Sequence, residues 1–215
     1  AVLRETGLDK TTAIIFTSDH GEMLGEHGQW YKMSFREGAS RVPLFIATPN
    51  NTQPLRISQA VTLADAGETL CALAGAPHAP EADGRDLTPF LKGAVSGPDE
   101  IFGEYLGEGT FAPTVMIRRG EWKFIYTPDD PDQLYHLVND PHEARNLAQA
   151  PAYAATTQAF RAEALQRWAF EALRHRVVLS QERRKLVKRA FATRHCTASD
   201  YAPPAKAHRA YIRHP

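Results

Sequence analysis

An acid, an imidazole and an amine lie within a short stretch near the start of this 215-residue chain. Asp19 and His20 follow an apolar run at residues 12–16, and Lys32 follows a glycine-rich loop. A carboxylate beside an imidazole suits a divalent cation, and a compact ammonium suits a bound anion. A bare Asp-His-Gly can also form a plain turn in which the aspartate caps the next element. The tripeptide alone therefore leaves both interpretations open.

The elements that must position these side chains can be predicted from the pattern around them. Residues 12–16 are apolar, uncharged and too few for a helix, which predicts a strand buried on both faces. In open α/β sheets, ligands bind beyond the carboxyl ends of parallel strands. Asp19 and His20 would therefore emerge at the edge where a site forms, and the glycines after them would let the backbone turn sharply.

Composition narrows the class of protein. The chain is 43% hydrophobic, enough for one good core, and its 25 basic and 25 acidic residues balance. A net charge of zero gives no reason to expect nucleic acid or a membrane surface as a partner. No apolar run approaches the roughly 20 residues of a spanning helix. The two distant cysteines, Cys71 and Cys196, form no disulfide framework and favour a reducing, cytoplasmic location.

The longer string around the acid and the amine is specific. Residues 18–21 (Ser-Asp-His-Gly), 24–28 (Leu-Gly-Glu-His-Gly), 30–32 (Trp-Tyr-Lys) and 41–44 (Arg-Val-Pro-Leu) keep a characteristic order and spacing. Together they resemble the sulfatase signature of the alkaline-phosphatase-like superfamily. The resemblance implies that Asp19 and His20 are metal ligands. It also implies that Lys32 is catalytic and binds a sulfate oxygen of the substrate.

The resemblance also implies an α/β fold and two cofactors. The chain would be the C-terminal part of an alkaline-phosphatase-like doubly wound sheet, with a small antiparallel sheet and C-terminal helices. The nucleophile of sulfatases is a formylglycine made from Cys-x-Pro/Ala-x-Arg, which neither Cys71 nor Cys196 matches. We therefore expect the nucleophile in sequence N-terminal to this chain. Ca²⁺ is the expected divalent cation, with Mn²⁺ and Mg²⁺ as alternatives.

Changes in pattern along the chain predict three parts. Residues 1–97 would complete the catalytic α/β domain, including a helix that starts near Thr62 or Leu63 and ends at Gly75. Residues 98–150 hold short β-like runs at 101–106, 115–118 and 122–126, which predict a small antiparallel sheet. Residues 151–215 would form C-terminal helices and an extended tail, with Ser180 as the N-cap of the second helix.

Within the sulfatases, the resemblance is greatest to choline sulfatases, through residues 104–109, 116–125 and the tail at 200–213. It implies choline sulfate, a small sulfate ester, as the substrate. A quaternary ammonium is held by aromatic faces and carboxylates, so Glu104 and Glu108 are predicted to bind the substrate. In that family one subunit's tail reaches its neighbour's site, which adds Asp200 and Tyr201 and implies a homo-oligomer formed through the C-terminal helices and tail. Ser199 departs from the usual tail, where tryptophan is common.

Three functions remain open from the sequence. The first is a sulfuric-ester hydrolase, present here as a portion that lacks the nucleophile and is expected to be inactive when isolated. The second is a phosphonate or phosphodiester hydrolase of the same superfamily, which shares Ser-Asp-His-Gly and the lysine. The third is an inactive fragment with only an assembly role.

Overall fold

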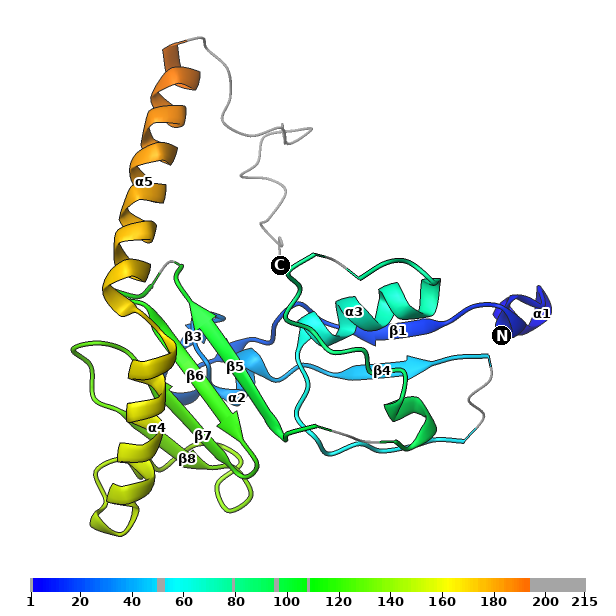
Figure 1. The fold of residues 1–215 in the computed structure, drawn as a ribbon, viewed down its shortest axis with the longest axis horizontal. Coiled ribbons are helices and arrows are strands. Elements are labelled where there is room, and N and C mark those ends of the chain that lie inside the picture. Colours follow the sequence, from blue (N-terminus) through cyan, green and yellow to red (C-terminus); the bar gives the residue numbers. More distant parts are fainter. Residues whose placement is uncertain (1, 50–52, 79, 95–96, 108, 194–215) are drawn as a thin grey trace, which may run out of the picture. The chain divides into compact units, whose positions relative to one another are not determined.

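The computed structural model describes residues 2–49, 53–78, 80–94, 97–107 and 109–193 (Figure 1). Its contacts divide the chain into two compact units, Ala1–Phe170 and Glu171–Pro215. The three-part division at residues 97 and 150 stays a prediction. The chain opens with two short helices, α1 (Val2–Glu5) and η1 (Leu8–Lys10), before its first strand.

Two short strands lie on either side of the predicted site loop. Strand β1 (Ile14–Thr17) pairs antiparallel with β4 (Leu44–Ala47), with Thr17 opposite Leu44. The expectation of a strand buried on both faces is wrong for this chain, since Phe16 is 60% exposed and Ile14 46% exposed. The run is apolar enough for burial, but the segments that cover a strand decide its burial. Within the described residues, only β4 pairs with β1.

A second small ribbon follows the site loop. Strand β2 (Met23–Leu24) pairs antiparallel with β3 (Trp30–Tyr31), and the 3₁₀ turn η2 (Glu26–Gly28) connects them. Gly25 has a φ of 116°, which only glycine adopts readily. The one-turn helix α2 (Glu37–Ser40) then precedes β4.

Helix α3 (Leu63–Ala74) begins and ends where its caps predict. The Thr62 side chain accepts a hydrogen bond from the Asp65 amide, and the Asp65 carboxylate accepts one from the Thr62 amide. This reciprocal capping box satisfies two otherwise free backbone donors. Gly75 closes the helix in the left-handed conformation, at φ 65°. The buried Asp65 carboxylate also accepts hydrogen bonds from Arg85, so its role is structural.

The predicted antiparallel sheet is confirmed. After the short turn η3 (Phe90–Lys92), four strands follow one another along the chain and pair in sequence order. They are β5 (Glu100–Tyr105), β6 (Thr114–Arg119), β7 (Trp122–Tyr126) and β8 (Gln133–His136). Each neighbouring pair is antiparallel, as short connections between consecutive strands require.

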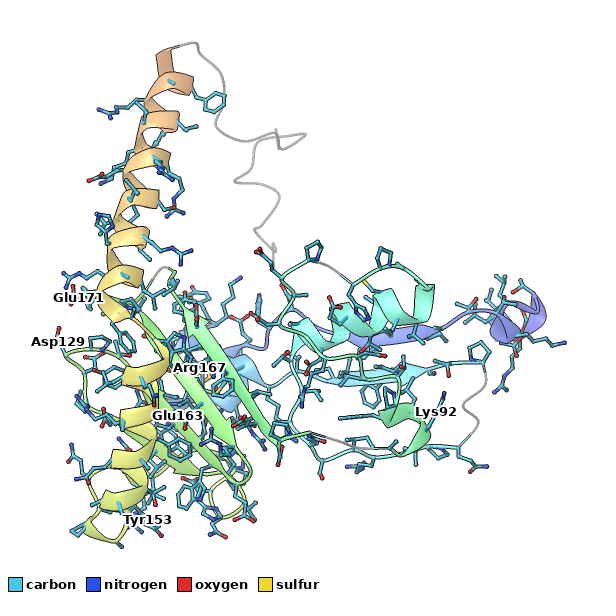
Figure 2. The ribbon with its side chains drawn as sticks, viewed as in Figure 1. Lys92, Asp129, Tyr153, Glu163, Arg167 and Glu171 are labelled. Atoms are coloured by element: carbon cyan, nitrogen blue, oxygen red, sulfur yellow. The ribbon has the colours of Figure 1, made fainter. Side chains whose placement is uncertain are left out.

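Both faces of this sheet are covered, because alternate side chains of a strand point to opposite faces. On one face, after the turn η4 (Pro151–Tyr153), helix α4 (Ala154–Arg167) lies along the strands (Figure 2). Phe124 of β7 stacks on Phe160 of this helix at 5.7 Å between ring centroids. On the other face, Met116, Ile125 and Tyr135 form a buried cluster against Phe35. The core of the first unit therefore includes a contact with the segment that follows Lys32.

The C-terminal helices differ from the prediction in where they break. Helix α5 (Phe170–Thr193) is continuous, so Ser180 lies inside it and the expectation of an N-cap there is wrong. The break falls at Trp168, whose backbone is extended, with φ −116° and ψ 124°. Trp168 is buried and donates a hydrogen bond to Glu104, and this tertiary anchor outweighs the local capping preference of a serine. Among the described residues, no helix has the length and apolar character needed to cross a membrane.

Candidate functional site

The turn after β1 holds its own backbone in place. The Ser18 hydroxyl donates to the carbonyl of His20 at 2.8 Å, and the Asp19 carboxylate accepts the amide of His20 at 3.0 Å. The hydrogen bond from the His20 amide lowers the pKa of Asp19 below its ordinary value. The carboxylate is therefore ionised at neutral pH, and it projects into solvent with 83% of its side chain exposed.

The His20 ring has a defined orientation. Its Nδ1 atom lies 2.7 Å from the carbonyl oxygen of Gly21. A carbonyl oxygen can only accept, so this contact places the proton on Nδ1 and leaves the lone pair on Nε2. Nε2 lies 3.5 Å from Asp19 Oδ2. The two potential ligand atoms of the Asp-His pair are thus adjacent.

Lys32 returns to this pair although it is 12 residues away in the chain. The pairing of Met23 with Tyr31 folds the glycine-rich loop back on itself. The Lys32 Nζ atom then lies 3.1 Å from His20 Nε2. The acid, the imidazole and the amine predicted from the sequence are therefore brought together.

A close backbone approach fixes the turn against α2. The Gly21 amide donates to Ala39 O at 2.7 Å, and the Glu22 amide donates to Gly38 O at 2.9 Å. A Cβ atom at position 21 would lie only 2.1 Å from Gly38 O, which no side chain could tolerate. Gly21 is thus required by packing as well as by the turn.

The donor set fits a divalent cation only in part. An ionised carboxylate and a neutral imidazole nitrogen are suitable ligands. Across the described residues, however, no group of three or more histidine, cysteine, aspartate or glutamate side chains could hold a metal ion. Asp19 and His20 would contribute two ligands, and the others must come from elsewhere. Lys32 occupies the lone pair of His20, so a cation bound at Nε2 would displace its ammonium group.

Comparison with known proteins places this arrangement in a family. The family model described as Sulfatase matches residues 1–76, which contain all three of these side chains. Choline-sulfatase from Rhizobium meliloti is 40% identical over 217 residues, covering 98% of this chain and 42% of that protein. The chain belongs to the sulfatase family. The resemblance inferred from the motif string is thereby confirmed.

Two further comparisons show how far the similarity to known proteins extends. Arylsulfatase K from Danio rerio is 40% identical over 156 residues, covering 69% of this sulfatase chain and 30% of that protein. A phosphonate monoester hydrolase from Silicibacter pomeroyi has a TM-score of 0.68 at 28% identity, covering 77% of this chain and 36% of that one. The fold is the alkaline-phosphatase-like fold of these proteins, as predicted. The chain spans less than half the length of each.

Of the other predicted site residues, the structure describes only Glu104. Glu104, on β5, accepts a hydrogen bond from Trp168 Nε1 at 2.6 Å, so its carboxylate has a structural partner. Its predicted role in substrate binding stays a prediction. Glu108, Asp200 and Tyr201 lie outside the described residues.

Gly109 lies close to the residue that follows Lys32. A Cβ built on Gly109 would lie 3.4 Å from the Cβ of Met33, the residue after Lys32. The segment that follows β5 therefore passes beside the segment that carries the predicted catalytic lysine. His27, at the tip of the glycine-rich loop, contacts His142 O through Nε2 at 3.0 Å and acts as a loop hydrogen-bonding residue.

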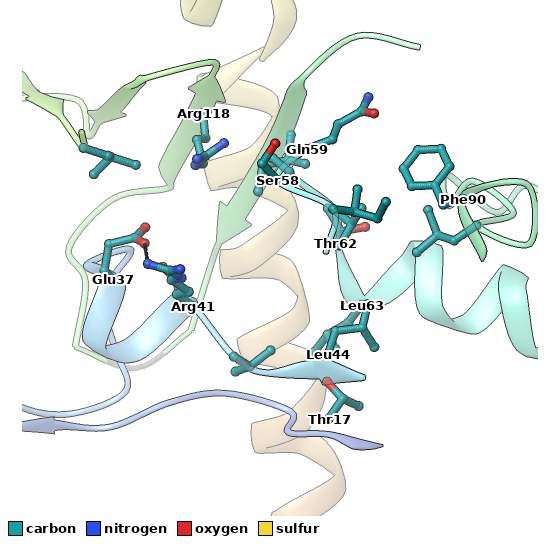
Figure 3. Close-up of a pocket in the computed structure, with 18 of the residues that line it drawn as sticks. Thr17, Glu37, Arg41, Leu44, Ser58, Gln59, Thr62, Leu63, Phe90 and Arg118 are labelled. Atoms are coloured by element: carbon teal, nitrogen blue, oxygen red, sulfur yellow. Dashed lines mark ion pairs between the residues drawn. The ribbon is translucent and has the colours of Figure 1, made fainter. Parts of the chain in front are cut away.

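A large hollow in the first unit does not coincide with this trio. A groove of about 1240 Å³ runs between residues that include Glu37, Arg41 and Arg118 at one part and Thr17, Leu44 and Phe90 at another (Figure 3). Asp19, His20 and Lys32 do not line it. The geometry of the trio, and not the size of the hollow, identifies the candidate site in this sulfatase chain.

Sequence reasoning missed a group of buried charges behind the site. Lys123 on β7 is 1% exposed and contacts Glu37 and Glu143. A lysine inside the apolar run at residues 122–126 was the only local signal for it. Its acidic partners are distant in the chain, so no spacing rule could have paired them.

Proposed function

We propose that this chain is the C-terminal portion of a choline sulfatase, an enzyme that uses water to hydrolyse choline sulfate to choline and sulfate. The observation that carries the proposal is the contact of Lys32 Nζ with His20 Nε2 at 3.1 Å, beside Asp19. A match that extends over 98% of the chain supports choline sulfatase over arylsulfatase K, whose match covers 69%.

Each residue of the trio would have a separate role. The Asp19 carboxylate and the His20 Nε2 lone pair would bind a divalent cation, with Ca²⁺ preferred and Mn²⁺ or Mg²⁺ as alternatives. Such a cation, when bound, withdraws charge from the ester and from the attacking oxygen. Lys32, released from His20, would hold a sulfate oxygen and neutralise charge as the alcohol leaves. The hydrogen bond from Nδ1 to Gly21 O keeps the ring nitrogen facing the cation unprotonated.

The nucleophile and the specificity elements lie partly elsewhere. A hydrated formylglycine in sequence N-terminal to this chain would attack sulfur through one of its hydroxyl groups, with the alcohol as the leaving group, so the isolated chain would be inactive. Glu104 and Glu108, with Asp200 and Tyr201 from a neighbouring subunit, would surround the quaternary ammonium. A homo-oligomer joined through the C-terminal helices and tail would follow from this arrangement, and the two distant cysteines favour a cytoplasmic location.

The gene and the enzyme give a direct test. We expect the sequence upstream of Ala1 to encode Cys-x-Pro/Ala-x-Arg, and we expect the whole polypeptide to release sulfate from choline sulfate. The structural similarity to a phosphonate monoester hydrolase makes phosphonate and phosphodiester esters the competing substrates. Faster hydrolysis of an aryl phosphonate than of choline sulfate would favour that second function. An upstream sequence without the cysteine motif would favour an inactive assembly role.

A further inference from the structure

Lys123 is held between two carboxylates in the interior of the first unit. Its Nζ atom lies 2.5 Å from Glu37 Oε1 and 3.0 Å from Glu143 Oε1, and it donates to Phe35 O at 2.9 Å. The exposed fraction is 1% for the Lys123 side chain and 2% for that of Glu143. Buried charges of this kind persist only when they are paired, because each would otherwise lose its hydration without compensation.

Glu143 supplies the cap that α2 lacks. Arg36, at the N-cap position of α2, makes no side-chain capping hydrogen bond. Glu143 Oε2 instead accepts the amide of Glu37 at 2.7 Å, and the Glu143 carbonyl accepts from Arg36 Nη1 at 2.7 Å. The first turn of α2 is therefore anchored by a residue 106 positions away in the chain.

From α2, one line of hydrogen bonds leads to His20. The carbonyls of Gly38 and Ala39 accept the amides of Glu22 and Gly21. The carbonyl of Gly21 in turn fixes Nδ1 of His20. The orientation of the imidazole thus depends on where α2 lies.

A second line leads from the same place to Lys32. The Arg36 amide donates to Ser34 Oγ at 3.1 Å, and the Ser34 amide donates to Lys32 O at 2.8 Å. Phe35 lies between Ser34 and Arg36, and its carbonyl oxygen accepts a hydrogen bond from Lys123 Nζ. Lys123 therefore contacts the segment from which both chains of hydrogen bonds start.

We infer that Lys123, Glu37 and Glu143 are positioning residues that set where His20 and Lys32 lie relative to each other. Removing the charge of Lys123 would leave the buried Glu143 carboxylate facing the partly buried Glu37 carboxylate, so α2 would shift and both lines would move with it. The four-stranded sheet would thereby control the geometry of a site that lies in a different part of the first unit. The catalytic consequence, unlike the structural one, rests on the proposed function.

Amide hydrogen exchange in the 215-residue chain tests the structural part. We expect Lys123→Met to accelerate exchange of the Gly21 and Glu22 amides by about tenfold relative to the Ala66 amide of α3. Arg119→Met is the control on the same sheet, since Arg119 pairs with Glu100 of β5 and Glu163 of α4 and makes no described hydrogen bond to α2. Equal acceleration of Gly21 and Glu22 exchange in the two variants would overturn the inference.

A milder variant covers the case in which Lys123→Met does not fold. Glu143→Gln keeps an oxygen for the Glu37 amide, and it replaces the oxygen that faces Lys123 with an uncharged NH2 group that cannot accept from the ammonium. It should accelerate exchange at the same two amides, and unchanged exchange there would reject the role of the network.

Sulfate release by the whole enzyme then separates this inference from the proposed function. Glu143→Gln should lower kcat by about tenfold with little change in KM, because a shifted Lys32 would stabilise the transition state less well. An unmodified enzyme that releases no sulfate would reject the proposed function, while the exchange result would still decide the positioning role. Normal kcat in an active Glu143→Gln enzyme would reject the positioning role alone.

Discussion

The ammonium of Lys32 lies 3.1 Å from Nε2 of His20, although 12 positions separate the two residues in the chain. The short pairing of β2 with β3 creates this proximity, and the Nδ1 contact with Gly21 O determines which ring nitrogen faces the lysine. An unprotonated nitrogen beside an exposed carboxylate and an ammonium is an arrangement that a cation and an anion could enter together.

Lys32→Ala in the whole enzyme should lower sulfate-ester turnover by about 100-fold or more, since it removes one charged donor at the transferred group. The side chain is exposed, so the melting temperature should change little. Sulfate release and thermal melts measure the two effects. Lys92→Ala, at another exposed lysine, is the control and should alter neither. A large drop in melting temperature with normal turnover would make Lys32 a structural residue.

Gly21→Ala should destabilise the chain by about 1–3 kcal/mol, because the added methyl would collide with Gly38 O. Gly67→Ala is a matched control within α3, where a Cβ meets nothing within 4 Å. That change should stabilise the chain by about 0.5–1 kcal/mol through helix propensity. Urea unfolding of both variants gives the free energies. Equal and small effects would show that the backbone approach at Gly21 carries no constraint.

Glu163 provides a prediction about pH. Hydrogen bonds from Arg119 at 2.8 and 2.7 Å lower the pKa of Glu163 below its ordinary value of 4.5. As the pH falls, Glu163 is therefore protonated in the unfolded chain before it is protonated in the folded chain. The stabilisation is present above about pH 4.5 and is lost as the pH falls through the pKa of the folded state.

Glu163→Gln should therefore lower the melting temperature at pH 7 and have a smaller effect near pH 3. Thermal melts across this range would measure the difference between the variant and the unmodified chain. A difference that stays constant from pH 7 to pH 3 would contradict a stabilising ion pair with Arg119.

Glu104→Gln and Glu108→Gln test recognition of the quaternary ammonium. A glutamine at position 104 can still accept from Trp168 Nε1, so the fold should be kept. Each change should raise KM for choline sulfate by about tenfold and leave a neutral aryl sulfate nearly unchanged, because only the cation loses a counter-charge. Steady-state kinetics with both esters would show this. An equal effect on the two substrates would exclude the counter-charge role.

The sequence by itself determined the features whose causes are local. The caps of α3 at Thr62 and Gly75 follow from neighbouring residues, and the antiparallel strands follow from short alternating runs with tight turns. The motif string that contains Asp19, His20 and Lys32 was recognisable because its order and spacing resemble the sulfatase signature, and that resemblance implied the roles of the three residues. These features depend on contacts within a few residues of chain, which the pattern itself encodes.

Only the tertiary structure decided the partners of residues that are far apart. Strand β1, which was expected to be buried, forms an exposed antiparallel pair with β4. Lys123 forms ion pairs with Glu37 and Glu143, and Glu104 accepts a hydrogen bond from Trp168. The tertiary structure also moved the break between the last helices from Ser180 to Trp168. Each outcome depends on burial and on charges meeting across long chain separations. Local propensity is too weak to fix such contacts, because their free energy comes from packing against segments far away in the sequence.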